Sequence, residues 1–467
     1  MIGHHRNRIA VLLAALTAAL PPAACAAADR GPADKAPADD KAAAEPVFPK
    51  ELPWFNTAPL TEKDLDGKVV LIDFWCYTCV NCIRTLPYIK EWHKRYAPHG
   101  LVIIGVHAPE FEFEKNAEHI KTAVGRFELA YPVVMDQGQF VWRSFDNQFW
   151  PAKYLFADGK ELFAPRGEGG AAYRLTRAMI SDLASDGVPE GVIAKLESLV
   201  GKGYPGEAAF RAALVEAVGK DGLTRAGLDI LRVAGRLGGA QTRAKYHHFG
   251  EGDYAETERT IQAALRARGV TAEFPPPMKP VAELDAVENR GAVCYPVTRE
   301  LYANFRGLRQ GQWGQDVELG RSRLYREYEH PLKFREGQAY LKGTWQVMDE
   351  YARHPVKTAG YEDYLGIRYK AVEVNAVIHL HTGKGPVRVK VTLDGGPMPK
   401  DHAGPDVVYE NGESFLEITE PRMYRIVESR KWGYHDLALW PKDDGFAVYA
   451  FTFGSCLKPE AANPPRE

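Results

Sequence analysis

Residues 67–82 read Gly-Lys-Val-Val-Leu-Ile-Asp-Phe-Trp-Cys-Tyr-Thr-Cys-Val-Asn-Cys, and this stretch decides the fold. Its part from 68 to 75 is a short, almost continuous apolar run behind a turn residue, which is typical of a strand buried on both faces. Apolar residues then recur at helical spacing, at Leu86, Ile89, Trp92 and Tyr96. The pattern predicts a strand that leads into a helix, with Cys79 and Cys82 at the junction.

This junction suits thiol chemistry. Cysteines three residues apart in the first turn of a helix lie close enough to form a disulfide. The unpaired N–H groups and the positive dipole end of a helix N-terminus stabilise a thiolate on the first sulfur, that of Cys79. Thiol–disulfide exchange needs such a nucleophile. We therefore predict a redox-active pair in Cys79-Val80-Asn81-Cys82.

The surroundings of the pair resemble the thioredoxin fold. That family has a buried Asp six residues before its first active-site Cys, where Asp73 stands, and a Pro five residues after the second, where Pro87 stands. The resemblance implies that Asp73 accepts the proton of Cys82.

The family also has a cis-Pro that opens a strand ending in a turn. Trp150-Pro151 begins such a segment here, and Asp158-Gly159 carries a hairpin signal at its end. By this resemblance, Pro151 places the substrate backbone beside the cysteines.

A third cysteine, Cys76, extends the motif to Cys-x2-Cys-x2-Cys. The pair could be read three residues earlier, but the positions of Asp73 and Pro87 favour Cys79–Cys82. Two roles stay open for Cys76: a small buried apolar group beneath Cys79, or a third exchanging thiol. An iron–sulfur cluster or a zinc site would need a fourth ligand at a suitable spacing, so we expect no metal and no cofactor.

The resemblance narrows to exported thioredoxin-like proteins of the TlpA and DipZ type. The segments 79–88, 105–111 and 246–254 are similar to DipZ segments, and within the second of these Glu110 is a candidate for a further acid–base group. DipZ proteins carry their own membrane electron-transfer domain, which we do not find in this sequence. If the reaction is reductive, the resemblance implies a separate membrane electron donor of the CcdA/DsbD kind.

The N-terminus resembles an export signal. Residues 1–28 combine a basic start, a weakly apolar run and small residues before Asp29. Cys25 stands in a context similar to a bacterial lipoprotein box and is a candidate for a lipid anchor. Residues 29–49 are poor in large apolar groups and are predicted to be a flexible tether. The mature protein is expected in a periplasmic or other extracytoplasmic space, where disulfides persist.

The predicted thioredoxin-like domain spans 50–268 and is interrupted by a helical insertion at about 172–240. A strand near 244–248 and a helix near 253–267 would then complete the fold. The alternative is that the fold closes by 185 and residues 186–268 are an appendage.

A second, all-β domain is predicted after a linker at 269–289. It spans 290–458 and is followed by a tail at 459–467. Val387–Leu393 alternates apolar and polar residues, and Phe446–Phe453 is another strand candidate. The region looks like the C-terminal extension of DipZ proteins, which is similar to jelly-roll carbohydrate-binding modules. A glycan is therefore a possible partner, although Trp313, Trp345 and Trp432 more often represent core residues.

Cys294 and Cys456 stand at the two ends of this second domain. In jelly-roll sheets the first and last strands commonly run side by side, and neither cysteine has a nearby partner in sequence. In an oxidising compartment we predict a structural Cys294–Cys456 disulfide; the alternative is two buried thiols.

Composition limits the remaining choices. In 467 residues, Lys and Arg number 59 and Asp and Glu 61, so the formal charge of −2 argues against nucleic-acid binding. We predict an exported thiol–disulfide oxidoreductase that acts on protein thiols or disulfides, in cytochrome c maturation or envelope redox homeostasis. The rivals are a peroxiredoxin-type peroxidase, disfavoured because Cys76 replaces the usual Thr, and a non-enzymatic envelope protein that binds through the sandwich.

Overall fold

The computed structural model describes residues 47–163, 173–175, 180, 190–204, 213–217, 244–281, 293–326, 334–381 and 386–457. The predicted export signal, Cys25, most of the tether, most of the insertion and the tail lie outside the described residues. Of the insertion, the described elements are β6 (Tyr173–Arg174), α6 (Glu190–Glu197) and β7 (Gly203–Tyr204). No helix within the described ranges is long and apolar enough to cross a membrane.

Six strands form the sheet that carries the cysteine motif. Its order is β1-β4-β3-β2-β5-β8. The strands are β1 (Trp54–Phe55), β2 (Val69–Trp75), β3 (Leu101–His107), β4 (Val133–Met135), β5 (Ala152–Phe156) and β8 (Tyr246–Phe249). Strand β2 runs parallel to β3 and antiparallel to β5, and all seven of its residues are buried. The predicted buried strand and the thioredoxin-like fold are confirmed.

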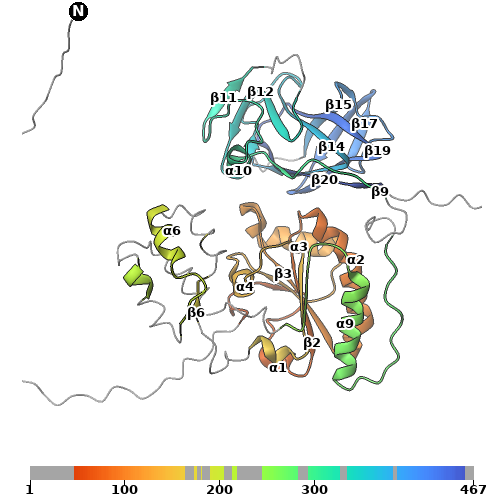
Figure 1. Ribbon diagram of the computed structural model, residues 1–467. Helices are drawn as coiled ribbons and strands as arrows, with labels where there is room; N and C mark the ends of the chain where they lie inside the picture. The colour runs from red at the N-terminus through yellow and green to blue at the C-terminus, as the bar shows by residue number, and fades with distance from the viewer. Residues whose placement is uncertain are drawn as a thin grey trace, which may run out of the picture. The chain divides into compact units, whose positions relative to one another are not determined.

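Helices cover both faces of this sheet. They are α1 (Glu62–Leu65), α2 (Val80–Tyr96), α3 (Ala117–Arg126), α4 (Phe140–Ser144) and α9 (Tyr254–Ala267), with 3-10 turns η1 (Ala97–His99), η2 (Glu112–Lys115) and η3 (Gly159–Leu162). Figure 1 shows α2 and α9 side by side, and the rings of Tyr88 and Tyr254 stack between them at 3.7 Å. Helix α4 packs on the opposite face, where Val141 and Phe145 join Ile72 and Phe74 in a second core.

The last strand of the sheet comes from far along the chain. Strand β8 pairs antiparallel with β5, with Lys153 opposite His248, and α9 follows directly. These two elements occupy the positions expected for the strand near 244–248 and the helix near 253–267.

Two local expectations were wrong. Asp158-Gly159 does not make a hairpin: Asp158 caps η3 by accepting a hydrogen bond from the Lys160 amide, and the strand that pairs next with β5 is β8. Gly159 is needed for close packing, since a Cβ there would lie 2.3 Å from the Leu65 carbonyl oxygen.

The tether ends earlier than 49, because Val47 and Phe48 are buried in the second core.

The C-terminal region is an 11-stranded antiparallel sheet in which β14 also pairs with β20. Its main strands run in the order β10-β20-β13-β12-β14-β19-β15-β18-β17. Their bounds are β10 (Leu301–Tyr302), β11 (Ser322–Tyr325), β12 (Gln338–Val347), β13 (Ala352–Arg353), β14 (Tyr364–Leu380), β15 (Val387–Leu393), β16 (Gly396–Pro397), β17 (Val407–Glu410), β18 (Glu413–Ile418), β19 (Arg422–Pro441) and β20 (Phe446–Gly454). A short helix, α10 (Phe305–Arg309), and the pair β9 (Val293–Cys294) and β21 (Cys456–Leu457) complete the region.

This region confirms the expected β-rich domain. The predicted alternating strand is β15, and the predicted apolar strand is β20. Trp313 and Trp345 are buried in the core, as expected. Trp432 is only partly buried, and its ring stacks on Tyr295 at 5.2 Å.

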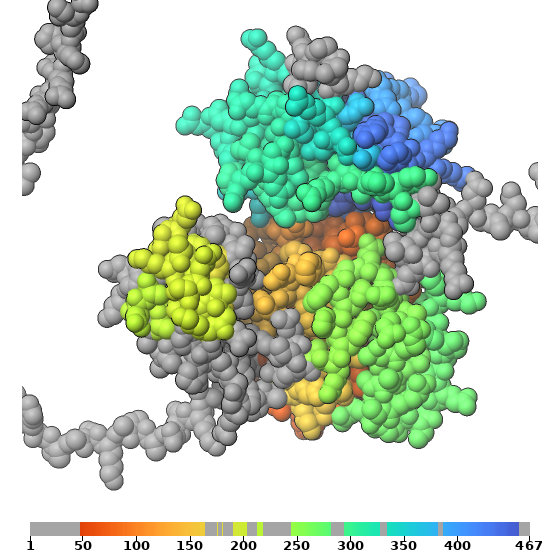
Figure 2. All heavy atoms as spheres, in the orientation of Figure 1, coloured from red at the N-terminus to blue at the C-terminus, as the bar shows by residue number. Residues whose placement is uncertain are grey.

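The two domains share a hydrophobic core. Tyr302, Val377 and Tyr449 from the β-rich region belong to the same buried cluster as Trp75 and Leu86. The start of the predicted linker is also packed in place, with Phe274 edge-on to Tyr96 at 5.4 Å. In Figure 2, α9 and the segment after it, in green, lie on the surface of the protein.

Candidate active site

Cys79 and Cys82 lie at the N-terminus of α2, as the sequence predicted. Cys79 is the N-cap residue and is partly exposed, whereas Cys82 is fully buried, and both are free thiols. The backbone amide of Cys82 donates to Cys79 Sγ at 3.3 Å. Burial raises the pKa of Cys82, and its neighbour Cys79 adds to that rise. The pair therefore consists of one accessible sulfur that a helix amide supports and one enclosed thiol.

Asp73 lies in β2 and faces a buried lysine. The two residues are cross-strand partners in β2 and β5, and Lys153 Nζ lies 3.8 Å from Asp73 Oδ1. Both side chains are fully buried, and neither makes a hydrogen bond among the described residues. Burial raises the pKa of Asp73 to about 6, while the charge of Lys153 acts in the opposite direction. A carboxyl group of this kind can change its protonation state near neutral pH.

The buried hydroxyl of Tyr131 makes no hydrogen bond among the described residues. Burial raises the pKa of Tyr131, and the neighbouring charges of Asp73 and Cys82 raise it further. Sequence reasoning did not find Lys153, although a lysine inside the otherwise apolar strand after Pro151 was a visible signal.

The Trp150–Pro151 peptide bond is cis and directly precedes β5. The rings of Trp150 and Trp142 are in tilted contact with centroids 4.1 Å apart, and Trp150 Nε1 donates to the Ala108 carbonyl at 3.0 Å. The Pro151 carbonyl accepts a hydrogen bond from the Gly250 amide at 2.8 Å. Contacts on both sides thus hold this loop, and the Gly-Glu-Gly segment at 250–252 provides one of them.

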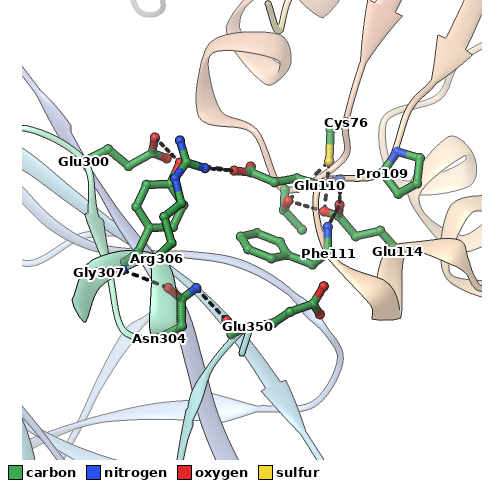
Figure 3. Close-up of polar contacts among 12 residues, drawn as sticks. Cys76, Pro109, Glu110, Phe111, Glu114, Glu300, Asn304, Arg306, Gly307 and Glu350 are labelled. Carbon is green, nitrogen blue, oxygen red and sulfur yellow. Dashed lines mark hydrogen bonds and ion pairs between the residues drawn. The ribbon is translucent and has the colours of Figure 1, made fainter. Parts of the chain in front are cut away.

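Cys76 lies at the end of β2 against a carboxylate that the sequence did not reveal. Its Sγ donates to Glu114 Oε1 at 2.8 Å, and the Thr78 hydroxyl donates to the same oxygen. The other oxygen, Oε2, accepts from the amides of Glu110 at 2.6 Å and Phe111 at 3.0 Å (Figure 3). Burial raises the pKa of Cys76, and the nearby charge of Glu114 raises it further.

Glu110, the candidate for a further acid–base group, makes its side-chain contacts with the β-rich region, and burial raises its pKa to about 8. Its carboxylate accepts from the Tyr302 hydroxyl at 3.1 Å and pairs with Arg306 at 3.4 Å, both in the β-rich region (Figure 3). None of its hydrogen bonds among the described residues reaches a cysteine. The η2 turn instead directs Glu114 back toward Cys76, because two amides at its start hold that carboxylate.

Cys294 and Cys456 are bonded as a disulfide across the short pair of strands β9 and β21. Their sequence separation is 162 residues. The bond joins the first and last strands of the β-rich region. Within the described part of the chain, no group of three or more His, Cys, Asp or Glu side chains is arranged to hold a metal ion.

Comparisons with known proteins agree with both regions. Residues 46–158 match the Redoxin family model, and residues 298–454 match the family model described as "Thioredoxin like C-terminal domain". Protein DipZ of Mycobacterium tuberculosis is 39% identical over 140 residues, which are 29% of this chain and 20% of that protein. These matches make the chain similar to thioredoxin-like proteins of the TlpA/DipZ type.

Other relatives align with smaller parts of the chain. The thiol-disulfide oxidoreductase YkuV of Bacillus subtilis is 27% identical over 111 residues, 24% of this chain and 74% of that protein. A solution structure of a thioredoxin-like protein in the oxidised form is 28% identical, covers 24% of this chain and 75% of that chain, and has a TM-score of 0.22. The chain spans only a fifth of the length of the DipZ relatives it matches.

Proposed function

We propose that the chain is an exported thiol–disulfide oxidoreductase that acts on protein substrates. The observation that carries the proposal is the unequal pair at the start of α2, with Cys79 partly exposed at the N-cap and Cys82 buried behind it. An accessible sulfur supported by a helix amide suits a nucleophile, and a buried neighbour suits a resolving thiol.

The reaction has two steps. The Cys79 thiolate attacks one sulfur of a substrate disulfide, forms a mixed disulfide and releases the other sulfur as a thiolate. Cys82 then loses its proton to Asp73 and attacks Cys79 Sγ. This step forms the Cys79–Cys82 disulfide and releases the second substrate sulfur. Because the dithiol carries both electrons, no cofactor is needed, and Pro151 holds the substrate backbone next to the pair.

The cellular setting follows from the same proposal. Reduced Cys79–Cys82 would be regenerated by a separate membrane donor of the CcdA/DsbD kind, and the substrates would belong to cytochrome c maturation or envelope redox homeostasis. Cys25 would attach a lipid anchor, and the β-rich region would offer a surface for a glycan.

Insulin reduction by dithiothreitol tests the activity. We expect the protein to accelerate insulin precipitation and the Cys79→Ser variant to lose the acceleration. Cys82→Ser should accumulate mixed disulfides, because attack survives and resolution does not. Equal acceleration by Cys79→Ser would refute the assignment, and rapid peroxide consumption would indicate a peroxidase instead. Equilibration with glutathione gives the reduction potential and thereby the direction of electron flow.

A further inference from the structure

The cysteine motif offers two disulfides, and the backbone permits both. The Cys79 amide donates to the Cys76 carbonyl at 3.2 Å, which closes a four-residue turn between these two cysteines. The ends of such a turn lie within about 7 Å, a range that includes disulfide geometry. Cys82 follows Cys79 by one helical turn, and its backbone amide donates to Cys79 Sγ at 3.3 Å, so this pair is also adjacent. Backbone spacing therefore does not explain which thiol resolves a mixed disulfide.

Glu114 contacts the thiol of Cys76 but not that of Cys82. Four donors converge on its carboxylate: the thiol of Cys76, the hydroxyl of Thr78 and the amides of Glu110 and Phe111. The S–H of Cys76 is thus directed at a buried carboxylate. Burial raises the pKa of Glu114, and its four hydrogen bonds act in the opposite direction because they favour the charged form. The contacts of Cys82 among the described residues include no carboxylate within hydrogen-bonding distance.

The charge of the Glu114 carboxylate opposes the ionisation of Cys76. A Cys76 thiolate would stand beside the carboxylate at the present 2.8 Å, inside a site from which water is excluded. Like charges so close in a buried site strongly oppose ionisation. Phe111 and Phe113, on either side of Glu112, pack on Tyr449 of β20 at 5.0 and 4.8 Å, so the β-rich region covers the turn that carries Glu114.

Resting on the proposed function, we propose that Glu114 is a positioning residue that keeps Cys76 protonated and out of thiol exchange, which leaves Cys82 as the resolving thiol. In this proposal, Glu114 determines that the Cys79–Cys82 disulfide forms rather than the Cys76–Cys79 disulfide. It also decides between the two roles left open for Cys76, in favour of a thiol that does not exchange.

The test uses dithiobis(nitrobenzoate), whose coloured thionitrobenzoate leaving group counts each attack. All variants carry Cys25→Ser, so that this thiol does not react. In Cys82→Ser, Cys79 attacks the reagent and releases one thionitrobenzoate, while the second stays bound to Cys79. If Cys76 then attacks Cys79 Sγ, its proton passes to solvent, a Cys76–Cys79 disulfide forms and the second thionitrobenzoate is released.

We expect the second release to be slow in Cys82→Ser and at least about tenfold faster when Glu114→Gln is added, since one pKa unit changes the thiolate fraction tenfold. Peptide mapping should then find the Cys76–Cys79 disulfide, and adding Cys76→Ser should abolish the second release. The matched control is Glu112→Gln, on the same turn, where the carboxylate is exposed and pairs with Lys115. That variant should leave the slow rate unchanged.

A second measurement needs no change at Glu114. In Cys82→Ser the second release should stay slow up to about pH 9, whereas an ordinary thiol would accelerate it near pH 8.5. Two results would overturn the role of Glu114 and leave the proposed function intact. One is a second release whose pH dependence has its midpoint near about 8.5, as for an ordinary thiol. The other is a second release that is no faster when Glu114→Gln is added to Cys82→Ser and the protein remains folded. Failure of the first release from Cys79 would instead refute the proposed function.

Discussion

At the scale of single residues, the site depends on two buried carboxyl groups with opposite surroundings. Asp73 makes no hydrogen bond among the described residues, and Lys153 Nζ lies 3.8 Å from its Oδ1. Glu114 accepts four hydrogen bonds and is fixed by them. A carboxyl group without such donors gains or loses a proton at little cost to its surroundings. Asp73 therefore suits proton transfer, and Glu114 suits a fixed structural charge.

The first prediction concerns Asp73→Asn. Because burial raises the pKa of Asp73 to about 6, this group can accept a proton above that pH and cannot below it. The insulin reduction rate of the unmodified protein should therefore rise with pH through about 6. The variant should lose this rise and react roughly 100-fold more slowly at neutral pH, within the range for general acid–base catalysis. Rates from pH 5 to 8 check this, and an unchanged profile would remove Asp73 from the mechanism.

A second prediction separates Lys153 from Asp73. Lys153→Met keeps an unbranched side chain but removes the charge that opposes the rise in the pKa of Asp73. The rise of the insulin reduction rate should therefore move to higher pH, while the variant stays active at alkaline pH. Lys160→Met is the matched control, because Lys160 is exposed in η3. If both variants shift the profile equally, Lys153 does not tune Asp73.

At the scale of secondary-structure elements, local patterns were predicted well and long-range packing was not. The β2–α2 junction, β15 and β20 follow from periodicities within a few residues. Gly159 was misread because its requirement comes from the Leu65 backbone, far away in sequence. Lys153 and Glu114 were missed for the same reason: only the pairing of β5 with β2 and the folding of η2 onto Cys76 bury them. Charged residues are usually solvated, so sequence alone favoured neither.

The disulfide between β9 and β21 supplies the third prediction. Replacing both Cys294 and Cys456 by Ser should lower the free energy of unfolding by several kcal/mol, nominally about 5 in the chain-entropy model, because the bond closes a very long loop. Urea unfolding of the two proteins measures the difference. Thiol exchange at Cys79 should remain, since the bond belongs to the β-rich region. Free thiol label on both residues in unfolded, unreduced protein would contradict the bond itself.

At the scale of the whole molecule, the two family matches do not correspond to two independent units. Arg84, two residues after Cys82 in α2, pairs with Glu373 of β14 at 2.8 Å, and Arg126 pairs with Glu420 at 2.7 Å. Apolar residues of both regions form one buried cluster. Because a common core links their stabilities, we expect the described parts of the two domains to unfold together.

Tyr449 gives the last prediction. It is buried at 2% exposure in β20 and packs on Phe111 and Phe113 of the thioredoxin-like domain. Tyr449→Ala should cost about 3 kcal/mol or more, as large-to-small changes in cores do. Tyr434→Ala, at a site that is 50% exposed, should change stability by about 0.5 kcal/mol or less.

Urea unfolding should be followed by fluorescence and by alkylation of Cys76. Both probes should give one coincident transition that shifts with Tyr449→Ala, because loss of this contact weakens the core on both sides. Two separate transitions, with Cys76 unaffected by Tyr449→Ala, would mean that the domains fold independently and that the shared cluster contributes little.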